Sequence, residues 1–277
     1  MMSRILFFDI DGTLAHPGQH PTPATITAIR QLRANGHKAF LSTGRTMDSI
    51  PGSVAEIDFD GGIFSSGAVV MFGDQVIAQH FMPDDLVQRI LTILVREAAL
   101  FSLETADGRF NSENGSDLLS QIDPSCVNSK MMQLAHDVLL DATAIPYSKY
   151  NGQPVYKIAY YSIHQSLPAL LSFELGNLAK VVPFNNIPGF PLATGEISDP
   201  SITKGRALRE ICDHLNVPIT STIAFGDSMN DAEIISVAGL GVAMGNADPA
   251  LKEQADLICD RCENDGIAKA LDLLKLI

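Results

Sequence analysis

Two aspartates, Asp9 and Asp11, have the residue type and the spacing to do chemistry together. They follow the apolar run 5–8, which predicts a buried strand, and Gly12 behind them permits a sharp turn. Because side chains alternate faces along a strand, we expect both carboxylates to project the same way. Like charges held this close repel each other unless a cation or a shared proton lies between them. The pattern therefore indicates a metal-binding or proton-transferring pair.

Two further polar clusters follow predicted strands. One is Thr-Gly-Arg at 43–45, and the other is Gly-Asp-Ser-Met-Asn-Asp at 226–231. In open parallel sheets the site lies beyond the carboxyl ends of the strands, so we expect both clusters beside the first pair of acids. A group of acids that includes Asp227 and Asp231 needs a divalent cation. Ligands that are all oxygen favour Mg²⁺.

Lys204 is the fourth candidate residue. It lies at the start of a predicted helix, 205–215, where the helix dipole disfavours a cation. A residue that opposes the local preference of a helix in this way indicates a functional role. A lysine at this position would hold an anionic phosphoryl group or offset the charge of Asp9.

The two ends of the chain alternate predicted strands with predicted helices. This alternation predicts an α/β fold with a Rossmann-like, doubly wound parallel sheet and helices on both faces. Thr22 is the expected cap of the first helix. The expected strands are 5–8, 38–41, 62–65, 222–225, 241–244 and 257–258, and the expected helices are 23–34, 205–215, 231–237, 249–255 and 266–274.

The middle of the chain reads differently. It mixes helices 86–99 and 167–178 with strands 101–104 and 155–161, and it contains a polar stretch at 107–128. We therefore expect a core domain of residues 1–83 and 191–277 and an inserted α+β domain of residues 84–190.

Composition excludes several classes of protein. A formal net charge of −13 argues against nucleic-acid binding, and charged residues interrupt the most apolar stretch, 86–103, so we expect no membrane span. The amino terminus does not resemble a secretory signal. Four cysteines without such a signal favour reduced thiols and a cytoplasmic protein. Cys259 and Cys262 are interpreted as incidental thiols, because no second ligand pair has the spacing of a zinc site.

The four motifs together resemble the haloacid dehalogenase superfamily, and more narrowly its Cof-type (type IIB) phosphatases. They are Asp9-x-Asp11-Gly12-Thr13, Thr43-Gly44-Arg45, Lys204-Gly205 and Gly226-Asp227-x-x-Asn230-Asp231. The long insert lies between the second and third motifs, which in this superfamily marks a type-2 (C2) cap. One departure is Ser66-Gly67-Ala68, where many relatives have Asn-Gly-Ala.

The resemblance implies a role for each motif residue. Asp9 is the nucleophile that forms an aspartyl-phosphate, and Asp11 is the general acid and base. Mg²⁺ is held by Asp9, the main-chain carbonyl of Asp11 and Asp227. The implied phosphate-binding residues are Gly12, Thr43, Gly44 and Lys204, and the implied supporting residues are Arg45, Asn230 and Asp231.

Structural interpretations of these residues stay open beside the functional ones. Thr43 and Asp231 are suited to capping helices, Lys204 to a solvated surface, and Arg45 to a structural ion pair. His16 and His20 resemble a ligand pair but lack a further partner in sequence.

The function expected from the resemblance is Mg²⁺-dependent hydrolysis of a small phosphorylated metabolite, with a sugar phosphate as the leading candidate. The alternatives are a phosphotransferase similar to phosphomannomutase and a non-catalytic binding protein on the same scaffold. The sequence indicates neither the natural substrate nor the oligomeric state.

Overall fold

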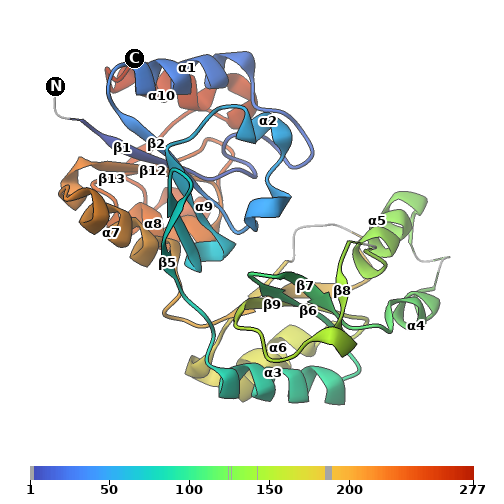
Figure 1. The fold of residues 1–277 in the computed structure, drawn as a ribbon. Coiled ribbons are helices and arrows are strands. Elements are labelled where there is room, and N and C mark those ends of the chain that lie inside the picture. The colour runs from blue at the N-terminus through green and yellow to red at the C-terminus, as the bar shows by residue number, and fades with distance from the viewer. Residues whose placement is uncertain (1–2, 124, 126, 142, 185–188) are drawn as a thin grey trace. The chain divides into compact units, whose positions relative to one another are not determined.

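The computed structural model describes residues 3–123, 125, 127–141, 143–184 and 189–277, which form two compact units (Figure 1). The first unit contains Met1–His80 and Ser201–Ile277, and the second contains Phe81–Pro200. The second unit thus ends later than the expected boundary at residue 190. The reason is strand β11 (Ala193–Ser198), which pairs antiparallel with two strands of that unit. Among the described residues, no helix is both long and apolar enough to cross a membrane.

The first unit has an eight-stranded sheet in its described residues, in the order β14-β13-β12-β1-β2-β3-β4-β5. The six strands from β14 to β3 are parallel, which confirms the predicted fold class. The hairpin β4–β5 adds two antiparallel strands that the sequence analysis missed. The bounds are β1 Ile5–Phe8, β2 Lys38–Ser42, β3 Gly61–Phe64, β4 Val69–Phe72, β5 Gln75–Gln79, β12 Thr222–Gly226, β13 Leu240–Ala243 and β14 Leu257–Ile258.

Helices cover both faces of this sheet, with α1 and α10 together on one face and α7 and α8 on the other (Figure 1). The side chain of Thr22 accepts a hydrogen bond from the Thr25 backbone, which confirms the predicted cap of α1. Aromatic rings of neighbouring strands stack in the core, Phe8 on Phe225 and Phe7 on Phe40. The bounds are α1 Pro23–Ala34, α2 Gly52–Ala55, α7 Lys204–Leu215, α8 Ala232–Val237, α9 Pro249–Lys252 and α10 Gly266–Leu273.

The second unit has a six-stranded sheet in its described part, in the order β10-β11-β9-β6-β7-β8. Its pairs are antiparallel except β7 with β8, so the unit is α+β, as predicted. Helices α3 and α6 pack their apolar faces on this sheet, and α4 and α5 form a smaller cluster with it. The bounds are β6 Leu100–Thr105, β7 Gly108–Asn111, β8 Ile145–Pro146, β9 Val155–Ser162, β10 Lys180–Pro183, α3 Asp84–Arg96, α4 Gly115–Ser120, α5 Ser129–Leu139 and α6 Leu167–Leu175.

Short 3₁₀ turns complete the described chain. They are Met47–Ser49, Ser65–Gly67, Tyr147–Lys149, Gly176–Leu178, Ile219–Ser221, Met229–Asp231 and Cys262–Asn264.

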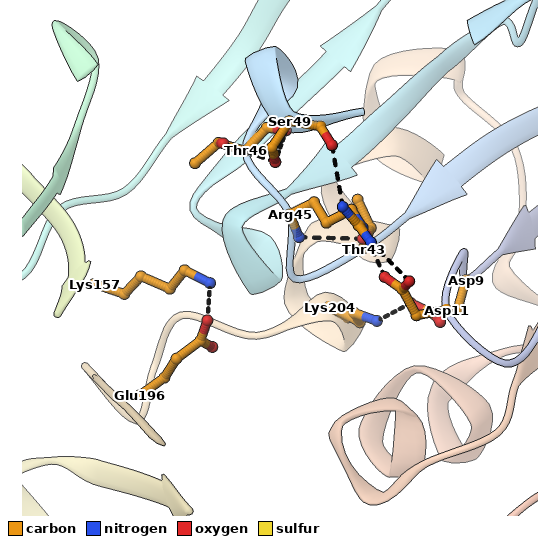
Figure 2. Close-up of polar contacts among 9 residues, drawn as sticks. All are labelled: Asp9, Asp11, Thr43, Arg45, Thr46, Ser49, Lys157, Glu196 and Lys204. Carbon is orange, nitrogen blue, oxygen red and sulfur yellow. Dashed lines mark hydrogen bonds and ion pairs between the residues drawn. The ribbon is translucent and has the colours of Figure 1, made fainter. Parts of the chain in front are cut away.

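Lys157 is a buried cation within the second unit. It is 2% exposed, and its ammonium group pairs with Glu196 (Figure 2). It also pairs with Glu104, 3.6 Å away. Burial raises the pKa of Glu104 to about 7, although the charge of Lys157 opposes this shift. The cluster therefore depends on the lysine to compensate two carboxylates removed from water.

We expect Lys157→Met to lower the free energy of unfolding by about 3 kcal/mol at neutral pH, because both glutamates lose their cation. Lys180→Met, at an exposed position of β10, is the matched control and should change stability by less than about 0.5 kcal/mol. Urea unfolding followed by circular dichroism measures both. Equal stability of the two variants would show that the cluster contributes nothing.

Candidate active site

Three polar segments meet at one edge of the parallel sheet. Strands β1, β2 and β12 are parallel neighbours, and Phe8 lies opposite both Leu41 and Phe225. The residues that follow these strands therefore share the carboxyl edge, where open α/β sheets form their sites. This places Asp9, Thr43 and Asp227 together, as the sequence analysis expected.

Lys204 joins this edge from the first turn of α7 (Figure 2). Its Nζ donates to Asp9 Oδ1 at 2.8 Å and to Asp231 Oδ1 at 2.6 Å, and the side chain is 1% exposed. Burial alone would lower the pKa of Lys204, but the charges of Asp231 and Asp9 outweigh it and raise the pKa. The interpretation of Lys204 as a solvated surface residue is therefore wrong.

Asp231 is fully buried and uses both carboxylate oxygens within the protein. One accepts from Lys204, and the other accepts from the backbone N–H groups of Asp227 and Ser228 at 3.2 and 3.4 Å. Ser228 and Asp231 also form a capping box at the start of the turn that leads into α8. Asp231 thus caps this segment and also holds Lys204 in place.

Asn230 has a different environment from Asp231. Its side chain is exposed, and its Oδ1 accepts from the Ser228 hydroxyl at 2.7 Å. Of the two expected supporting residues in the fourth motif, Asp231 therefore lies against the acids, whereas Asn230 supports the loop.

Asp227 offers a carboxylate oxygen that could bind a metal ion. Its Oδ1 is buried and has no hydrogen-bond partner among the described residues. Carboxylate oxygens of Asp9, Asp227 and Asp231 lie within 4.8 Å of one another. A Cβ on Gly12, where φ is +85°, would lie 2.1 Å from Asp227 Oδ2, so only glycine allows this approach. An oxygen-rich cradle with an unpartnered buried carboxylate oxygen fits Mg²⁺.

Asp11 has a different environment from Asp9. Strand β1 ends at Phe8, and residue 11 lies in the following turn, so the alternation of a strand does not reach it. The Asp11 carboxylate forms a two-pronged ion pair with Arg45, 2.7 Å to Nε and 2.8 Å to Nη2 (Figure 2). The hydrogen bonds that Arg45 donates to Asp11 are the main reason that the pKa of Arg45 is raised. Arg45 is thus an ion-pair partner, as the structural interpretation had it.

The Thr-Gly-Arg segment turns tightly behind β2. Thr43 is 1% exposed, and its hydroxyl accepts from the backbone N–H of Arg45 at 3.1 Å. The hydroxyl of Ser66 would lie 3.3 Å from a Cβ on Gly44. Ser66 itself has φ of +60°, a left-handed conformation that asparagine adopts more readily than most residues. Ser66 is the position at which this chain departs from Asn-Gly-Ala. Its backbone is therefore strained, and its side chain lies next to Gly44 of the second motif.

Asn246 belongs to this edge, although the sequence analysis missed it. Its amide nitrogen donates to the Gly12 carbonyl at 2.7 Å, and its Oδ1 accepts from the backbone N–H of Cys262 at 3.0 Å. It comes shortly after strand β13, at the same carboxyl edge. A polar residue shortly after a strand of the parallel sheet is a signal that could have identified Asn246 from the sequence.

The raised pKa values of Asp9 and Asp227 predict that the free energy of unfolding depends on pH. Burial raises the pKa of Asp9 to about 7, and burial with the negative charges of Asp9 and Asp231 raises the pKa of Asp227 to about 8. Both values exceed those of the unfolded chain, so without metal the protein should lose stability as the pH rises from about 4 to about 8.

Asp227→Asn removes one of these ionisations. In metal-free buffer we expect its Tm advantage over the parent protein to widen from pH 4 to pH 8, because asparagine needs no proton. With Mg²⁺ the order should reverse, since only the parent protein gains binding energy. Calorimetry at several pH values measures both effects. A pH-independent difference, or equal stabilisation by Mg²⁺, would contradict this account.

Comparison with known proteins agrees with this geometry. Residues 6–271 match the family of haloacid dehalogenase-like hydrolases. An HMP-PP phosphatase of Yersinia enterocolitica is 30% identical, covering 98% of this chain and 94% of its own. Phosphatase YwpJ of Bacillus subtilis is 26% identical, covering 96% and 97%. A solved structure of a HAD subclass IIB sugar phosphatase shares the fold, with a TM-score of 0.79 at 23% identity over 99% and 100% of the chains. The chain thus belongs to the haloacid dehalogenase superfamily, among its Cof-type phosphatases.

Proposed function

We propose that this protein is a Mg²⁺-dependent phosphomonoesterase that acts on a small phosphorylated metabolite, a sugar phosphate foremost, through an aspartyl-phosphate on Asp9. The observation that carries the proposal is the arrangement of Asp9, Lys204 and Asp227. A buried carboxylate is held by a buried lysine, beside a second carboxylate with an unpartnered oxygen. The phosphatase names of the relatives support the same reaction class.

In the first step an oxygen of Asp9 attacks phosphorus, and the bond from phosphorus to the ester oxygen breaks. The departing oxygen takes a proton from Asp11 in its acid form. Both oxygens of the Asp11 carboxylate accept hydrogen bonds from Arg45 in the structure. Substrate binding must therefore loosen the pair before Asp11 can carry the proton.

In the second step the Asp11 carboxylate removes a proton from water, and the water oxygen attacks phosphorus. The bond between phosphorus and Asp9 breaks, which releases inorganic phosphate and restores the Asp9 carboxylate. The two hydrogen bonds from Arg45 hold the Asp11 carboxylate in position for this step. Lys204 and the backbone at Gly44 stabilise the negative charge of the phosphoryl oxygens.

Asp9, Asp227 and the main-chain carbonyl of Asp11 would hold the Mg²⁺, and Lys204 already occupies Asp231. When bound, the ion reduces the repulsion between an anionic nucleophile and an anionic ester.

Release of inorganic phosphate from a panel of phosphorylated metabolites tests the proposal. The panel contains hexose phosphates, because a structural neighbour is a sugar phosphatase. It also contains HMP-PP, because relatives are named HMP-PP phosphatases. We expect release that requires Mg²⁺ and stops with EDTA. Conversion of a hexose 1-phosphate to its isomer without free phosphate would favour the phosphomannomutase-like alternative. No turnover of any member would favour a binding protein.

We assign substrate choice to the second unit, acting as a C2 cap. Deletion of residues 81–200 should reduce discrimination among sugar phosphates more than hydrolysis of an aryl phosphate, whose leaving group needs little recognition. Circular dichroism verifies that the shortened chain folds. If a folded deletion variant lost both activities equally, the second unit would have no special part in specificity.

A further inference from the structure

Outside the acidic group, three ligand-type side chains meet at a second place in the first unit. His16 lies in the loop after the first motif, and Cys262 and Glu263 lie in the 3₁₀ turn before α10. The sequence analysis left the histidine and the cysteine without partners because they are far apart in the chain. The fold brings them together, with one possible ligand atom from each residue within 4.8 Å of the others.

The spacing of these atoms is that of a coordination site. His16 Nε2 lies 3.0 Å from Glu263 Oε2, and Cys262 Sγ lies 3.4 Å from each of these two atoms. Tetrahedral Zn²⁺ with bonds of about 2.0 to 2.3 Å sets its N, O and S ligands roughly 3.3 to 3.6 Å apart. The triangle is therefore close to the size that one ion would impose, slightly contracted.

Hydrogen bonds with neighbouring groups orient the side chain of Glu263 and fix the backbone of Cys262. The second oxygen of Glu263 accepts from Arg261 Nε at 2.5 Å, so Oε2 is left facing His16 and Cys262. The backbone N–H of Cys262 donates to Asn246, which in turn donates to the Gly12 carbonyl. Outer hydrogen bonds of this kind are characteristic of metal ligands.

Exposure gives the site an entrance. Cys262 is 3% exposed, whereas the side chains of His16 and Glu263 are 34% and 38% exposed. Three protein ligands with one side open to solvent leave a fourth position for water.

We propose that His16, Cys262 and Glu263 bind a thiophilic divalent cation of the Zn²⁺ class, at a site distinct from the oxygen-only group around Asp227. A thiolate and an imidazole select Zn²⁺ over Mg²⁺, whereas carboxylates alone favour Mg²⁺. The ion would join the loop after Asp11 to the turn before α10. This proposal does not depend on the proposed function.

Cobalt titration of the metal-free full-length protein tests the site, with excess Mg²⁺ present to occupy the acidic group. We expect one Co²⁺ per chain with a thiolate-to-cobalt charge-transfer band in the near ultraviolet, and Zn²⁺ should displace it. Cys262→Ser should abolish the band. His16→Ala and Glu263→Gln should each weaken binding at least about tenfold. Both change side chains that are only partly buried, so they remain informative if Cys262→Ser does not fold.

Two controls separate this site from other metal binding. Cys259→Ser alters a neighbouring thiol that donates a hydrogen bond to Met244 Sδ. This variant should keep the band. Asp227→Asn should also keep it. The proposal is overturned if the parent protein gives no thiolate band, if Cys262→Ser retains it, or if His16→Ala and Glu263→Gln bind Co²⁺ as tightly as the parent.

Discussion

Replacement of Asp9 by asparagine is expected to abolish phosphate release, with a loss in kcat of about 10⁴-fold or more. Asparagine has nearly the same shape and can still accept a hydrogen bond from Lys204 Nζ, which lies 2.8 Å from Asp9 Oδ1. It is a much weaker nucleophile than a carboxylate, so the covalent step cannot proceed. Steady-state phosphate release with the best substrate of the panel measures the loss.

The control for this variant is Asp48→Asn, which changes an exposed aspartate in the 3₁₀ turn after Arg45. It removes the same charge from the same unit and should retain nearly full activity. Circular dichroism should show that both variants fold. Substantial activity in a folded Asp9→Asn protein would rule out Asp9 as the nucleophile.

Replacement of Lys204 by methionine is expected to impair both stability and catalysis. The ammonium group compensates two buried carboxylates, of Asp9 and Asp231, and methionine leaves these charges unpaired. Removing one partner of a buried ion pair costs about 3–5 kcal/mol. Hydrolysis should also be lost, because Lys204 is the cation that forms an ion pair with the nucleophile Asp9. Urea unfolding at neutral pH measures the stability change.

Arg206→Met is the matched control, because Arg206 lies in the same helix but is exposed and pairs with Glu210 on the surface. It should cost less than about 1 kcal/mol. Adding Asp9→Asn to Lys204→Met should recover part of the lost stability, since it removes one unpaired charge. If Lys204→Met were as stable as Arg206→Met, the buried cluster could not be what orders this site.

The sequence was sufficient to predict which segments meet at the site. Asp9, Thr43 and Asp227 each follow a strand of a parallel sheet, and such strands end at one edge. Lys204 was identifiable because a cation in the first turn of a helix opposes the helix dipole. These inferences use local pattern and a general rule of topology, so they required no coordinates.

Contacts between loops were beyond this reasoning. The Asp11 carboxylate turns to Arg45 because the strand ends before residue 11, and strand bounds cannot be read that finely from an apolar run. The meeting of His16 with Cys262 depends on the path of two loops that are far apart in sequence. The missed helix α5 buries only Ala135 and Leu139 among its described residues, which gives a weak periodic signal.

Hairpin β4–β5 is a different case, because its signal was present. The strands flank Gly73-Asp74, and Gly73 has φ of +56°. A glycine with a neighbouring aspartate between apolar runs is a turn signal for a two-residue hairpin. The omission was therefore one of interpretation and not of missing information.

Trapping the phosphoryl group on the protein tests the central claim most directly. Asp11→Asn with an aryl phosphate is the suitable pair, because a good leaving group needs no acid in the first step, whereas the second step still needs the base. After an acid quench, mass mapping should find one phosphoryl group on the peptide that contains Asp9, and none when Asp9→Asn is added. Aryl phosphate hydrolysis by Asp11→Asn at the parent rate, or a phosphoryl group on any other residue, would contradict the account.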